Sequence, residues 1–133
     1  MTAAQPASTV PDGPAAHATA ANNPAAGEQS PELDRAVATG LAALARMQNP
    51  DGSYGQAQQG RTVAVTALAS IAFMADGNIP GRGAYAEQVA KGLNYILANC
   101  NENGLIATAS ASSPMYGHGF ATLFLGEIDG MTQ

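Results

Sequence analysis

The chain has 133 residues, of which only 11% are charged, and its formal net charge is −5 at neutral pH. Its five Lys and Arg residues are scattered, which argues against nucleic-acid binding because that function needs clustered basic side chains. A single cysteine, Cys100, excludes an internal disulfide and leaves the redox compartment open.

No apolar run approaches the ~20 residues that a membrane span requires. The N-terminus shows neither the positive patch nor the apolar segment of a signal peptide. The sequence as written therefore favours a cytoplasmic location, and an upstream export signal before Met1 would make it extracytoplasmic. The compartment stays open.

Residues 1–30 are rich in Ala, Thr, Pro and Asn and carry almost no large apolar side chains. Such a composition offers nothing to offset the entropy of ordering, so we predict a disordered tail here. The folded part is then 31–133. Its first helix begins at Pro31, where Ser30 is placed to cap it, and is expected to end near Gln48. Apolar residues follow one face of that helix.

The second helix is predicted over 62–75, and it is apolar on nearly every side. Such a helix is expected to be buried all round. Its two hydroxyl residues, Thr66 and Ser70, are expected to bond back to the preceding turn. The third helix, over 84–99, is amphipathic like the first. The fourth begins at Pro114, is again apolar nearly all round, and is expected to close at Asp129-Gly130.

An internal repeat with a period of 52 residues relates the two halves of the folded part. Gly40 aligns with Gly92, Gly52 with Gly104, and apolar residues align with apolar residues along both helices of each half. Repeats of this size are typical of stacked helical units. The pattern of amphipathic and apolar helices predicts two concentric layers. Two hairpins cannot close such a ring, so we expect further repeats or self-association to cover the apolar helices.

The repeated stretch resembles the QW motif of the prenyltransferase and squalene oxidase (terpenoid cyclase) repeat superfamily. The first copy reads Thr39, Gly40, Ala43, Leu44, Gln48, Gly52, Tyr54, and the second reads Lys91, Gly92, Tyr95, Ile96, Cys100, Gly104, Ile106. The resemblance covers about 31–129. It implies an all-α fold in which two helical hairpins form part of an α/α toroid.

In this motif Gln48 is expected to accept hydrogen bonds from a neighbouring helix start, with Tyr54 stacked over its amide. Gly52 and Gly104 would permit positive φ. In the second copy Cys100 replaces the Gln and Ile106 replaces the aromatic residue. The contact that this turn makes should therefore be looser in the second copy than in the first.

The resemblance also implies an apolar cavity lined by the inner helices, able to hold an isoprenoid-type ligand. The candidate cavity residues are Phe73, Met74, His118, Phe120 and Phe124. His118 lies at the start of the fourth helix, where it would act as a neutral acceptor facing a ligand. The alternative is that it bonds a neighbouring carbonyl while Gly117 and Gly119 permit close helix packing.

No catalytic, cofactor-binding or metal-binding residue is assigned. The Asp-x-Asp-Asp run of the family's cyclases is absent, and the acids Glu127 and Asp129 are expected at the surface. Asp51, Cys100 and His118 are residue types found in zinc sites, but their spacing matches no zinc signature.

Three interpretations remain open. The first is a repeat segment that holds an isoprenoid-type ligand without a catalytic motif of its own. The second is a non-catalytic repeat module for protein–protein interaction. The third is that the chain is an incomplete gene product; if it belongs to an enzyme, the catalytic residues are missing from this segment.

Overall fold

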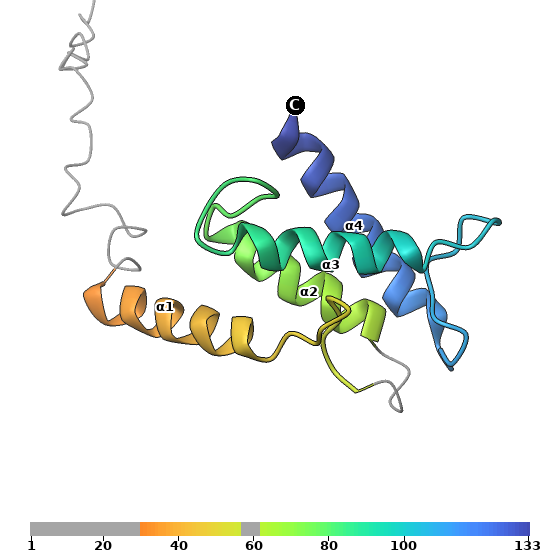
Figure 1. The fold of residues 1–133 in the computed structure, drawn as a ribbon, viewed down its shortest axis with the longest axis horizontal. Coiled ribbons are helices and arrows are strands. Elements are labelled where there is room, and N and C mark those ends of the chain that lie inside the picture. The colour runs from red at the N-terminus through yellow and green to blue at the C-terminus, as the bar shows by residue number, and fades with distance from the viewer. Residues whose placement is uncertain (1–29, 57–61) are drawn as a thin grey trace, which may run out of the picture. The chain divides into compact units, whose positions relative to one another are not determined.

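A computed structural model describes residues 30–56 and 62–133. Its helices are α1 (Pro31–Arg46), α2 (Thr62–Ala75), α3 (Ala86–Ala98) and α4 (Pro114–Thr132), and the described residues contain no strand (Figure 1). The all-α prediction is confirmed, whereas the toroid stays a prediction. The predicted tail, with His17, lies outside the described residues. The core lies in the unit formed by Val37–Gln133.

The helix limits follow the local signals with two corrections. Ser30 Oγ accepts a hydrogen bond from the Leu33 amide at 3.2 Å, as expected of a capping residue. However, α1 ends at Arg46, slightly before the predicted limit. The expectation that Asp129-Gly130 closes the last helix is wrong, since α4 continues to Thr132. Gly130 has no positive φ and therefore does not act as a cap.

The α2 helix is not buried all round. Val65 is 39% exposed and Leu68 is 45% exposed, whereas Thr66 and Ser70 are fully buried. The reason is that α2 packs chiefly against α3 and α4, so one side stays uncovered. Because apolar residues occur around nearly all of α2, the sequence did not predict which side of this helix faces the core.

Close packing of α2 against α3 depends on a glycine, which has no side chain. A Cβ atom added at Gly92 of α3 would collide with Ser70 Oγ and lie 3.6 Å from Ser70 Cβ. One helical turn away, the hydroxyls of Tyr95 and Thr62 are hydrogen bonded at 2.6 Å. The glycine thus permits the two helices to approach at this point.

The core combines one aromatic ring from each of the two apolar helices with aliphatic side chains of α3. Phe73 and Phe124 are fully buried, as are Val89 and Ile96. The ring of Phe73 also lies 4.9 Å from that of Tyr85, measured between centroids. These contacts use the face of α3 that the sequence pattern marks as apolar.

The turn after α1 and the turn after α3 make the same backbone hydrogen bonds at positions 52 residues apart. Asn49 N donates to the Ser53 carbonyl at 2.9 Å, and Asn101 N donates to the Leu105 carbonyl at the same distance. The residue that follows each turn is also held in the same way in both repeats. Its amide, at Tyr54 or Ile106, donates to a side chain on the next helix.

Candidate functional site

A pocket of about 490 Å³ opens between the first half of α2, the loop 106–113 and the first turns of α4. This volume lies in the range of small-molecule sites, about 300–1,000 Å³. Its apolar lining includes Val63 and Leu68 from α2, Ile106 from the loop and Phe120 from α4.

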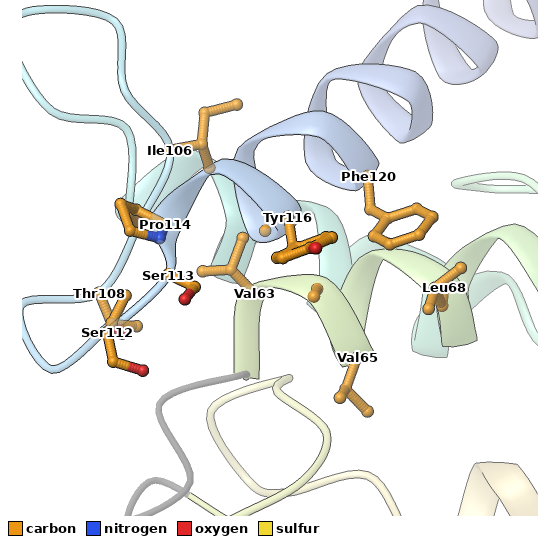
Figure 2. Close-up of a pocket in the computed structure, with 14 residues that line it drawn as sticks. Val63, Val65, Leu68, Ile106, Thr108, Ser112, Ser113, Pro114, Tyr116 and Phe120 are labelled. Carbon is orange, nitrogen blue, oxygen red and sulfur yellow. The ribbon is translucent and has the colours of Figure 1, made fainter.

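Hydroxyl groups line another part of the pocket. Thr108, Ser112 and Ser113 gather on one side in Figure 2, while Leu68 and Phe120 lie on the opposite side. None of the lining residues in the described part of the chain is charged. The pocket can therefore accommodate an apolar chain and offer hydrogen bonds to an uncharged polar end.

The start of α4 is held close to α2 by local sequence. Pro114 occupies the first helical position, where its missing N–H costs no hydrogen bond. Gly117 then leaves room for Val63, because a Cβ atom there would lie 3.3 Å from Val63 Cγ1. Together these residues bring the two helix starts together and form the base of the pocket.

His118 supports the wall of the pocket by holding the main chain of a residue that lines it. Its Nδ1 accepts a hydrogen bond from the Ile106 amide at 3.2 Å, and it is not among the residues that line the pocket. The partner of Nδ1 is thus a main-chain amide of the chain itself, whereas the sequence suggested a ligand or a carbonyl group as the partner of His118. An accepting Nδ1 places the proton of the neutral ring on Nε2.

Thr66 has the same role in the first repeat. Its hydroxyl accepts from the Tyr54 amide at 2.8 Å, which corrects the expectation of a bond within its own helix. Thr66 and His118 are 52 residues apart, as are Tyr54 and Ile106. Two chemically different side chains thus accept a hydrogen bond from the amide at the equivalent position of each repeat.

Of the five predicted cavity residues, Phe120 lines the pocket. Phe73 and Phe124 are fully buried and Met74 is 5% exposed, and all three belong to the packed core. The loop hydroxyls and Tyr116 were not predicted as site residues. The run of small hydroxyl residues directly before Pro114 was the available signal for them.

The first QW-like turn contacts α3 through Gln48, although its role differs from the one expected. Gln48 Nε2 donates to the Gly52 carbonyl at 3.0 Å and to the Gln88 carbonyl at 2.9 Å, rather than accepting from a helix start. Gly52, with a φ of +89°, lies so close to the Lys91 carbonyl that any Cβ atom would collide with it.

The second turn has the same backbone form but no such neighbour among the described residues. Gly104 has a φ of +83°, and a Cβ atom there would meet nothing within 4 Å. Cys100, at the position that corresponds to Gln48, is exposed. Whether the replacements at Cys100 and Ile106 loosen the second turn stays a prediction.

Tyr54 is 2% exposed, and its hydroxyl has no hydrogen-bond partner among the described residues. Burial raises the pKa of this phenol from 10.0 to about 12, because the phenolate would lose its hydration. The ring contributes to the core, while the hydroxyl contributes no observed bond.

The potential zinc ligands Asp51, Cys100 and His118 do not form a cluster. Within residues 30–56 and 62–133, no three His, Cys, Asp or Glu side chains are grouped so as to hold a metal ion. Of the helices in the described part of the chain, none has the length and apolar character that crossing a membrane requires.

Comparison with known protein families, with curated proteins and with solved structures finds no match to this chain.

Proposed function

We propose that this chain is a prenyltransferase- and squalene-cyclase-like repeat segment that holds an uncharged, isoprenoid-type molecule in the pocket between α2 and α4. The observation that carries the proposal is the lining of that pocket. Most of the lining is apolar, and among the residues that the structure describes the polar side chains that line it are all hydroxyl groups. An isoprenoid alcohol has matching chemistry, with a branched hydrocarbon chain and one neutral polar end.

The described lining residues carry no charge, and this narrows the class of ligand that we propose. A diphosphate head group would be expected to meet Arg or Lys side chains, which bind phosphate strongly. Within 30–56 and 62–133, no such side chain lines the pocket. The proposal therefore favours an isoprenoid alcohol or hydrocarbon over an isoprenoid diphosphate, and it assigns no catalytic step to the segment.

Titration calorimetry with geraniol and farnesol tests this proposal. We expect saturable binding of both alcohols and weaker binding of farnesyl diphosphate. Leu68→Gln should weaken binding about tenfold, since it removes apolar surface worth roughly 1.5–3 kcal/mol when fully buried. Leu123→Gln is the matched control, because Leu123 is a similarly exposed helical leucine that does not line the pocket. Equal effects of the two substitutions would contradict the proposal.

Protein–protein interaction is the second candidate, and the surface of α4 favours it. Met115 is 67% exposed, Tyr116 is 74% exposed and Leu123 is 51% exposed. Exposed apolar groups on one helix are typical of docking surfaces. If neither alcohol binds and a protein partner requires Leu123, this second function replaces the first.

A further inference from the structure

The interface between α2 and α3 joins the two repeats, and it has three recognisable parts. Gly92 lies against Ser70 without room for a side chain. Gly52, in the first turn, lies against the Lys91 carbonyl of α3. Val89, on the same helix, is fully buried.

In the 52-residue repeat, the residues of α3 that form this interface correspond to residues of α1 that are exposed. Val37 corresponds to Val89 and is 44% exposed. Gly40 corresponds to Gly92, and a Cβ atom there would meet nothing within 4 Å. Thr39, which corresponds to Lys91, is also exposed. The surface formed by Val37, Thr39 and Gly40 is called the α1 surface below.

The residues that correspond to the other half of the interface are uncovered as well. Thr122 on α4 corresponds to Ser70 and is exposed, whereas Ser70 is fully buried. Gly104 in the second turn corresponds to Gly52 and has free space where Gly52 meets α3. Thr122 and Gly104 form what is called the α4 surface below. The chain thus presents both halves of an interface that it already makes internally.

We propose that these two surfaces bind each other between copies of this chain, with the α1 surface of one copy on the α4 surface of the next. The contact would continue the α2–α3 interface from one molecule into its neighbour, as repeats do within solenoid proteins. Because the two surfaces differ, the contact is heterologous and generates a ring or an open filament. The proposal does not depend on ligand binding, since neither surface lines the pocket.

Gly40 fits this assignment through its correspondence to Gly92. A glycine inside a helix costs roughly 1 kcal/mol relative to alanine, and no described residue lies close enough to require one at this position. Close approach of a neighbouring helix is the common reason for such a glycine. In the equivalent pair, Gly92 is required for that reason.

Sedimentation velocity of the full chain under reducing conditions tests the association. We expect the mass to rise with concentration, and Gly40→Leu to weaken the association at least about tenfold, because a large side chain blocks helix approach. Gly130→Leu is the matched control, since Gly130 is also helical with free space around it and corresponds to Asn78, beyond the end of α2. A monomer at all concentrations, or equal effects of the two substitutions, would overturn the proposal.

Disulfide trapping tests the direction of the contact. Cβ atoms at Gly92 and Ser70 would lie 3.6 Å apart, within the range of about 3.5–4.5 Å that disulfides need. Gly40→Cys and Thr122→Cys chains, each with Cys100→Ser, should therefore form a dimer when mixed and oxidised. Each chain alone should remain unlinked. Linked dimers of either chain alone would indicate a symmetric contact and overturn the proposal.

A third variant strengthens the contact instead of weakening it. Cys100→Gln restores the amide that Gln48 uses against α3, now aimed at a main-chain carbonyl of the neighbouring α1. One added hydrogen bond should tighten the dissociation constant about fivefold. No change, or weaker association, would contradict the proposed role of the second turn.

Discussion

At the scale of single residues, the buried phenol of Tyr54 makes a pH-dependent contribution to stability. Its pKa is about 12 in the folded chain and 10.0 when unperturbed. Below pH 10 both states keep the proton, so nothing is lost. Between pH 10 and 12 the unfolded state releases it first, and the free energy of unfolding falls by up to about 1.4 kcal/mol per pH unit.

Tyr54→Phe should remove that component of the alkaline destabilisation. At pH 8 the variant should be as stable as the parent or slightly more stable, because it deletes a hydroxyl without an observed partner. Urea unfolding at pH 8 and pH 11 measures both effects. Tyr116→Phe is the control, since Tyr116 is 74% exposed and should leave the pH dependence unchanged.

His118 should matter to stability through the Ile106 amide. His118→Leu leaves that amide without its acceptor, which should lower the free energy of unfolding by about 1–3 kcal/mol. His118→Asn offers an oxygen near the position of Nδ1 and should retain most of the stability. Equal losses in the two variants, measured by urea unfolding, would show that the ring itself is what the site requires.

At the scale of helices and turns, the contact between α2 and α3 can be tested by a double substitution. Gly92→Ala should lower the free energy of unfolding by about 1–3 kcal/mol through collision with Ser70 Oγ. Ser70→Ala in the same chain removes that atom and should recover most of the loss. Gly40→Ala, at the equivalent position on α1, should instead raise stability by about 0.5–1 kcal/mol in dilute solution. Additive effects of Gly92→Ala and Ser70→Ala would contradict the proposed collision.

The two turns provide a second comparison of equivalent positions. Gly52→Ala and Gly104→Ala both impose a left-handed conformation on a residue with a Cβ atom, which costs roughly 1–2 kcal/mol. Gly52→Ala also brings that atom against the Lys91 carbonyl, which cannot move without moving α3. The loss of unfolding free energy in Gly52→Ala, measured by chemical denaturation, should therefore exceed the loss in Gly104→Ala. Similar losses would mean that the turn and α3 separate easily.

At the scale of the whole molecule, self-association should make thermal stability depend on chain concentration. Binding between folded copies stabilises the folded state by mass action. We expect the Tm, followed by circular dichroism under reducing conditions, to rise with concentration in the parent chain. The Gly40→Leu variant should show a Tm that is independent of concentration. A concentration dependence that survives this substitution would place the association on another surface.

The sequence alone determined the helices and their repetition, because both depend on neighbouring residues. Proline and the capping Ser30 placed the start of α1, and the apolar run of 62–75 coincides with α2. The 52-residue period reappears in the hydrogen bonds of both turns, since each turn is specified by its own Asn and Gly residues. The end of α4 was missed because a glycine closes a helix only where the backbone takes a left-handed conformation.

Only the tertiary structure decided which side chains meet. Periodicity carries no direction in a helix that is apolar on every side, so the pocket-lining face of α2 could not be read from it. The partners of His118 and Gln48 depend on backbone groups brought close by packing. Val37 and Val89 are the same residue type at the same repeat position, yet one is 44% exposed and the other fully buried. Burial depends on what packs against a helix, and that is a property of the assembled fold.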